Sequence, residues 1–248
     1  MAQALLLMIV LTAIFAASRI ASKRKLKTRG IPGIERLDKW IKQAADLNRP
    51  VFFTPGTGAV TTPDTLAALA LLDHVAKRCA ELSVRLIVAN ADFNVHQVTE
   101  DMVRNAYDKA GNGQLYSSDS VRYISGRQFA FAAGVMGLLR REKPALNIFV
   151  GDYQAEALEI AEAGRDEAIA QFGGTSNVDQ LPFFMATCDH TLIGEELYTA
   201  QGYLTDDPHA ISSLVGPDAG KIIAILLILA GALLASFGNQ LISTFLKL

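Results

Sequence analysis

A glycine-rich turn is the segment whose residue types and spacing are best suited to binding chemistry. The sequence PGTGAVT, at residues 55–61, follows an apolar run at 51–54 and precedes a helix start. A turn of this kind presents backbone N–H groups to a phosphate at the beginning of a helix. Gly56, Thr57 and Gly58 are therefore candidate ligand-binding residues.

An acid further along the chain is the candidate partner of this turn. Asp92 follows the second apolar run and is suited to bind a ribose hydroxyl, as an acid does in dinucleotide-binding proteins. The match to that fingerprint is poor, because Thr61 replaces the third glycine and Asp92 lies 36 residues beyond Gly56, where about 20 is usual. The sequence contains no GxxxxGK[ST] motif. A turn that serves only the backbone is the alternative, and the cofactor stays unknown.

A second group of reactive side chains is Cys188-Asp189-His190, followed by Glu195-Glu196. A thiol, a carboxylate and an imidazole are suited to nucleophilic catalysis or to metal binding. However, adjacent residues of a strand point to opposite faces, so Cys188 and Asp189 would not enter one cleft. Structural roles are favoured for all of them. The catalytic residues stay unknown, no metal site is predicted, and the balance leans away from an enzyme.

Short β-rich runs that alternate with helical stretches must position these residues. Strands are expected at 51–54, 84–90, 121–125, 145–150 and 183–188, and helices at 34–48, 61–82, 94–110, 126–143, 154–172 and 194–204. The strands are apolar without strict alternation, which is typical of strands covered on both faces. The pattern predicts an α/β domain over 34–205, with a doubly wound, mainly parallel, five-stranded Rossmann-like sheet.

One predicted helix is apolar on every side. Residues 129–139 read FAFAAGVMGLL, and this run is too short to cross a bilayer. A helix of this kind is usually buried in the protein core. A subunit interface, at which the glycines allow close backbone contact, is the alternative.

Two long apolar runs lie near the ends of the chain. They predict transmembrane helices at 2–20 and 221–246, joined to the α/β domain by a basic linker at 21–33 and a second linker at 206–220. The positive charges follow the first run, which favours a retained anchor with both termini outside and the α/β domain in the cytoplasm. Small residues four apart, Gly231 with Ala235 and Ala232 with Ser236, would let helices pack closely.

Charge and cysteine content narrow the function classes. The chain has 248 residues, a formal net charge of −2 and basic residues scattered among acids beyond the first linker. This distribution does not indicate nucleic-acid binding. The lipid bilayer is an expected partner, and the basic linker lies where anionic headgroups would be, but a role in setting the topology is favoured for its charges. Two isolated cysteines indicate neither a disulfide framework nor a four-cysteine zinc site.

Three segments carry a resemblance to a known family. They are RGIPGIERLDKWIKQAADLNRPVFFTPGTG at 29–58, SGRQFAFAAGVMGLLRREKPALNIFVG at 125–151, and LPFFMATCDHTLIGEELYTAQGYL at 181–204. With them the chain resembles a family of uncharacterised prokaryotic membrane proteins, catalogued as a domain of unknown function. The resemblance implies an α/β domain between membrane anchors in the cytoplasmic membrane of a prokaryote. It supplies no catalytic residues.

Two functional hypotheses follow from these patterns. The first is a membrane-anchored structural or accessory protein whose α/β domain self-assembles, as a homo-oligomer, or docks a partner of a membrane complex. The second is a protein or enzyme that binds a nucleotide or phosphorylated small molecule with Gly56, Thr57, Gly58 and Asp92. The first is favoured, because strong catalytic motifs are missing from the sequence and a fold alone does not establish chemistry.

Overall fold

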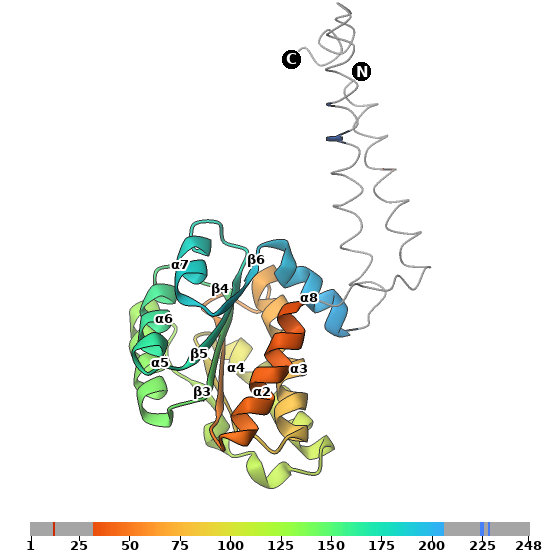
Figure 1. The fold of residues 1–248 in the computed structure, drawn as a ribbon, viewed down its shortest axis with the longest axis vertical. Helices are drawn as coiled ribbons and strands as arrows, with labels where there is room; N and C mark the ends of the chain where they lie inside the picture. The colour runs from red at the N-terminus through yellow and green to blue at the C-terminus, as the bar shows by residue number, and fades with distance from the viewer. Residues whose placement is uncertain (1–11, 13–31, 206–223, 226–227, 229–248) are drawn as a thin grey trace, which may run out of the picture. The chain divides into compact units, whose positions relative to one another are not determined.

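The computed structural model describes residues 12, 32–205, 224–225 and 228. The chain divides into two compact units, one formed by residues 29–204 and the other by residues 1–28 with 205–248. The first of these units holds the α/β fold (Figure 1).

The elements alternate between strands and helices along the chain. The strands are β1 (Val51–Gly56), β2 (Leu86–Asn90), β3 (Val121–Tyr123), β4 (Leu146–Asp152), β5 (Ala170–Thr175) and β6 (His190–Ile193). The helices are α2 (Pro32–Asp46), α3 (Pro63–Glu81), α4 (Phe93–Lys109), α5 (Gln128–Glu142), α6 (Glu156–Asp166), α7 (Leu181–Thr187) and α8 (Glu195–Thr205). Two short 3₁₀ helices, η1 (Gly113–Leu115) and η2 (Ser118–Ser120), precede β3.

The six strands form one parallel sheet in the order β3-β2-β1-β4-β5-β6. The chain starts at the centre with β1, moves outward to β3, and returns to place β4 on the other side of β1. The order therefore reverses between β1 and β4. In open sheets of this type, ligands bind where the order reverses, outside the carboxyl ends of the strands. We refer to that side of the sheet as the carboxyl edge.

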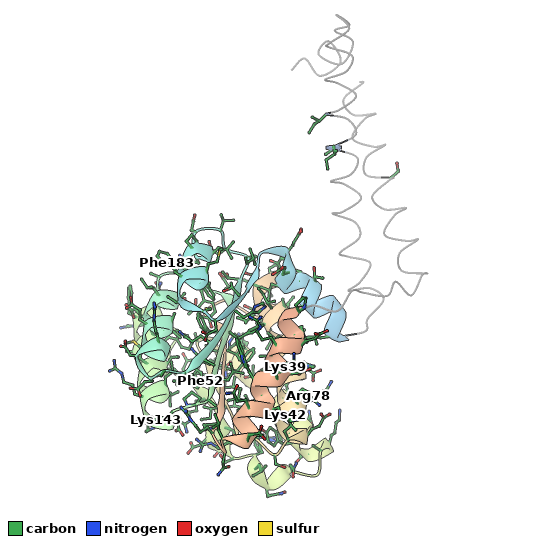
Figure 2. All side chains as sticks on the ribbon, viewed as in Figure 1. Lys39, Lys42, Phe52, Arg78, Lys143 and Phe183 are labelled. Carbon is green, nitrogen blue, oxygen red and sulfur yellow. The ribbon has the colours of Figure 1, made fainter. Side chains whose placement is uncertain are left out.

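Helices cover both faces of the sheet (Figure 1). On one face, residues of α2, α3, α4 and α8 pack with Val51, Phe53 and their neighbours in a single apolar cluster. On the other face, α5, α6 and α7 pack around Phe52 and Phe149. Figure 2 labels Phe52 within the sheet. Because both faces are buried, the central strands carry nearly continuous apolar runs, as sequence analysis predicted.

Glycines bring the ends of β1 and β4 unusually close together. Gly56 has φ +89° and Gly151 has φ +142°, conformations that side chains with a Cβ atom rarely adopt. A Cβ atom at Gly56 would lie 2.3 Å from the backbone oxygen of Asp152, and one at Gly151 would lie 2.0 Å from that of Pro55. The glycine-rich turn therefore begins with a close contact between two strands.

The strand prediction was wrong between residues 170 and 193. The predicted strand at 183–188 is α7, and the predicted helix at 154–172 ends at Asp166, as α6. The chain forms β5 and β6 there instead, so the sheet has six strands and not the predicted five. The predicted strands at 51–54, 84–90, 121–125 and 145–150 correspond to β1 to β4.

The predicted flanking transmembrane helices also need correction. None of the helices in the described residues combines the length and apolar character that a membrane crossing requires. The two segments in question, 2–20 and 221–246, lie outside the described residues except at 12, 224, 225 and 228. The fold that the structure describes is thus an α/β fold with a six-stranded parallel sheet.

The helix predicted to be apolar all round is α5, and one side of it faces solvent. Phe131, Val135 and Leu139 are buried against the sheet, whereas Phe129 is 61% exposed. Gly134 allows close packing, since a Cβ atom there would lie 2.2 Å from Cγ2 of Ile124. The helix is a surface helix with one buried face.

Candidate functional site at the carboxyl edge

Three carboxylates gather at the carboxyl edge, on both sides of the β1–β4 switch point. Asp152 ends β4, Asp64 lies in the first turn of α3, and Glu156 begins α6. They are close enough that Asp64 and Glu156 both raise the pKa of the Asp152 carboxyl. The hydrogen bonds of each carboxylate determine what it can do chemically.

Asp64 holds three elements together. Its oxygens accept hydrogen bonds from the backbone N of Ser176 at 3.0 Å and from the Ser176 hydroxyl at 2.8 Å. The Tyr198 hydroxyl of α8 donates a third, short hydrogen bond to the same carboxylate. Asp64 is buried. Its oxygens are thus occupied in joining α3, the loop after β5 and α8.

Glu156 plays a similar part on the other side of the switch point. Its side chain is buried and accepts hydrogen bonds from Thr57 Oγ1 at 2.8 Å, Gln128 Nε2 at 2.6 Å and Gln154 N at 3.1 Å. These donors are neutral. Glu156 therefore fixes the glycine-rich turn against α5 and α6.

Asp152 differs from its two neighbours. Among the hydrogen bonds of the described residues, its backbone oxygen accepts one from Thr57 N at 2.9 Å and a longer one from Thr57 Oγ1 at 3.5 Å, while its carboxyl group takes part in none. Desolvation by burial, and then the charges of Asp64 and Glu156, raise the pKa of this carboxyl above its ordinary value. A half-buried carboxyl of this kind at a switch point is a candidate binding group or proton carrier.

The predicted residues of the glycine-rich turn lie beside Asp152. Thr57 contributes its N–H to the Asp152 backbone oxygen and its hydroxyl to Glu156. Gly58 is tightly surrounded, since a Cβ atom there would lie 2.6 Å from Thr65 Oγ1 and 2.8 Å from Asp152 Cβ. The structure thus brings Gly56, Thr57 and Gly58 to one place, and part of their polar surface is used within the protein.

Asp92 lies elsewhere and has a local structural role. Its carboxylate accepts hydrogen bonds from the backbone N atoms of Asn94 and Val95, both at 2.9 Å, and so caps the N-terminus of α4. The residue that ends β2 is Asn90. Its side chain is fully buried, and both Nδ2 and Oδ1 are without a hydrogen-bond partner in the part of the chain that the structure describes.

Three rings lie next to this end of β2. Phe93 and Tyr123 meet edge to face with 6.0 Å between their centroids, and His96 packs on both, at 6.2 Å and 6.4 Å. Phe93 is 58% exposed and Tyr123 is 45% exposed. The aromatic cluster, defined as Phe93, His96 and Tyr123, therefore has an open surface.

Sequence analysis missed Asp152 and Asn90. Each is a polar residue at the end of a strongly apolar run, 86–90 or 146–152. That signal is visible in the sequence, but it becomes meaningful only once the strand order places both residues near β1.

The second predicted group does not form a common site. Asp189 accepts a hydrogen bond from Gln171 N at 2.8 Å, and the His190 ring packs on Phe172 with 5.3 Å between centroids. Burial raises the pKa of the Cys188 thiol to about 12, which disfavours a reactive thiolate. Cys188 and Asp189 line an open pocket of about 620 Å³ at the start of β5, away from the carboxyl edge.

No arrangement suited to a metal ion, with three or more His, Cys, Asp or Glu side chains, occurs within residues 32–205 or the other described positions. The predicted helix-packing residues, Gly231, Ala232, Ala235 and Ser236, lie outside the described residues.

Comparison with known protein families identifies the family of this chain. A family model described as "Domain of unknown function (DUF6754)" matches residues 1–246. The chain belongs to this family. The comparisons with curated proteins and with solved structures each returned no match. The predicted membership of an uncharacterised family is thereby confirmed, and the DUF6754 family itself assigns no activity to the carboxyl edge.

Proposed function

We propose that the α/β domain binds a small polar molecule at the carboxyl ends of β1 and β4. The observation that carries this proposal is the state of Asp152. Its carboxyl is half-buried and makes no hydrogen bond with the described residues, whereas the neighbouring Asp64 and Glu156 have their oxygens occupied. Of the three carboxylates, Asp152 is thus the one that can accept a ligand at the switch point, where ligands bind in open sheets of this type.

The charges at this place restrict the chemistry of the ligand. Three carboxylates, Asp64, Asp152 and Glu156, lie close to the glycine-rich turn. None of the three forms an ion pair within the described residues. A free phosphate placed beside them would be repelled. The group that meets Asp152 is therefore a hydroxyl or an amine, with which a carboxyl of raised pKa can exchange a proton.

A thermal-shift screen of the full-length chain tests this proposal. The panel holds nucleosides, nucleotides, sugars and sugar phosphates, because a ligand that binds only the folded state raises the melting temperature. A compound that stabilises the wild type should lose this effect in Asp152→Asn. Asp101→Asn, at an exposed position on α4, is the control and should respond as the wild type does. Stabilisation by none of the compounds would count against the proposal.

A second candidate function is self-association, for which exposed apolar side chains give support. Val178 is 75% exposed and Met185 is 61% exposed, and Phe183, labelled in Figure 2, belongs to α7 together with Met185. The segment 178–185 thus carries several exposed apolar side chains, which a protein interface would cover. We propose a second copy of the chain as the occupant of this surface.

Light scattering coupled to size exclusion tests the second candidate. Met185→Asp should shift the wild-type oligomer toward the monomer, because a charge at the centre of an interface is desolvated without a partner. Leu47→Asp, at a position that is 52% exposed on another part of the domain, should leave the mass unchanged. A monomeric wild type at micromolar concentration would exclude this function.

A further inference from the structure

We infer that the ligand is a nucleoside-type molecule whose base lies on the aromatic cluster and is read by Asn90. This inference rests on the proposed function, since it names the class of molecule that reaches Asp152. It depends on observations at the other end of the carboxyl edge, around the ends of β2 and β3.

The first observation is the open surface of the aromatic cluster. Phe93 and Tyr123 come from two different elements, α4 and β3, yet they pack edge to face and each keeps about half of its surface exposed. The Tyr123 ring is held in place, because its hydroxyl accepts a hydrogen bond from Gly126 N at 3.0 Å. A fixed, exposed ring pair offers a stacking surface for a planar heterocycle.

The second observation is the buried amide of Asn90. Nδ2 is a donor and Oδ1 an acceptor, and neither has a partner among the described residues. Leaving such groups unpaired in the protein interior costs free energy, so Asn90 lowers the stability of the fold unless a ligand pairs with it. An amide that offers one donor and one acceptor side by side matches the edge of a nucleobase.

The register of the sheet joins the two observations. Asn90 is the Cα partner of Tyr123 in the β2–β3 pairing, so their side chains lie on the same face of the sheet. His96, the third ring of the cluster, also has a buried Nδ1 that forms no hydrogen bond within the described residues. Unpaired polar atoms and exposed rings thus occur together at one end of one strand pair.

The distance across the sheet fits a single molecule. β2 and β4 are separated by β1 alone, so Asn90 and Asp152 end strands that are on the order of 10 Å apart. This is about the length of a nucleoside. A base at β2 and β3 would place the sugar over the glycine-rich turn, with a hydroxyl near Asp152.

Isothermal titration of the full-length chain with the four common ribonucleosides, and with ribose as the probe that lacks a base, tests the inference. At least one nucleoside should bind to the protein. Ribose should bind to the protein about tenfold more weakly than that nucleoside, or weaker still, because stacking of one base raises the affinity by roughly a factor of ten or more. Phe93→Ala should weaken nucleoside binding by a similar factor. Asn90→Leu and the more conservative Asn90→Asp should both weaken it. Phe129→Ala, which removes an exposed ring on α5 outside the cluster, should not.

The results separate this inference from the proposed function. If ribose binds as tightly as the nucleosides, or if Phe93→Ala leaves nucleoside affinity unchanged, the inference is overturned. The proposed function then still stands, provided that Asp152→Asn weakens the binding that remains. If the chain binds neither nucleosides, ribose nor any compound of the screen, both are overturned.

Discussion

Asp64, Asp152 and Glu156 share a chemical type and a location, but their hydrogen bonds give them different roles. Asp64 and Glu156 accept three hydrogen bonds each, and all but the one from Gln154 N join segments that are far apart in the sequence. Asp152 has no such bonds to its carboxyl within the described residues. Two of the carboxylates therefore stabilise the carboxyl edge, and the third is the one that the proposed ligand would meet.

The raised pKa of Asp152 predicts that its ionisation destabilises the folded state. The folded protein holds this proton more tightly than the unfolded chain does, so the stabilising contribution is complete below the ordinary value of 3.8 and is lost as the pH rises through the raised pKa. Asp152→Asn cannot ionise. We expect it to melt at a higher temperature than the wild type near neutral pH, with a difference that shrinks as the pH falls toward 3.8.

Melting curves across this pH range, recorded by circular dichroism, check the prediction. Asp101→Asn, at an exposed position, serves as the control and should follow the wild type. A lower melting temperature for Asp152→Asn near neutral pH would show that the ionised carboxylate is stabilised in the folded protein.

Glu156 should be important for stability, because its side chain is buried and its removal leaves three part-buried donors without an acceptor. Glu156→Ala is expected to lower the free energy of unfolding by about 1–3 kcal/mol, while Glu156→Gln, which keeps an oxygen for Thr57, should cost less. Urea denaturation measures the difference. Glu162→Ala, on the exposed side of the same helix, is the matched control. Equal losses for Glu156→Ala and Glu162→Ala would contradict this role.

Among the elements, the contact between β1 and β4 has the strictest requirement for glycine. Gly56→Ala would place a Cβ atom 2.3 Å from the Asp152 backbone oxygen at a φ of +89°, and we expect it to destabilise the fold by about 2 kcal/mol or more. Gly137→Ala on α5 meets no atom within 4 Å and should stabilise the helix by about 0.5–1 kcal/mol. Denaturant midpoints of the two variants should move in opposite directions, and a shared direction would refute the argument.

The elements that were predicted correctly are those with strong local signals. The runs that became β1 to β4 are apolar and are separated by helices with clear starts, such as Pro63 after Thr62 in α3. β5 has the sequence AQFGGT, in which two glycines indicate a turn. In the fold, Gly173 is needed for packing, since a Cβ atom there would lie 2.5 Å from Phe184 Cδ1. A tertiary contact thus overrode the local signal.

The same limit explains the error at α7 and the partial prediction of the site. α7 contains adjacent phenylalanines, which favour strands, but Pro182 fits its first turn and Phe184 fills the space above Gly173. Gly56, Thr57 and Gly58 could be identified from local chemistry. Asp152 and Asn90 could not, because their proximity to the turn depends on the strand order.

For the molecule as a whole, the position of the core residues predicts which part of the chain folds independently. Every strand of the sheet and both apolar clusters lie within residues 32–205. A fragment of residues 32–205 should therefore unfold in a single cooperative transition, measured by circular dichroism and tryptophan fluorescence of Trp40.

A shorter fragment, residues 32–189, provides the contrast. It lacks β6 and α8, whose Leu192, Leu197 and Ala200 are buried in the cluster formed with α2 and α3. It also lacks Tyr198, which donates a hydrogen bond to Asp64 at the carboxyl edge. We expect this fragment to lose the cooperative transition and, with it, the geometry around Asp152. If residues 32–189 instead unfold as cooperatively as residues 32–205, the last strand and helix do not contribute to the core in the way that their burial indicates. The carboxyl edge would then have to form without the contact between α8 and α3.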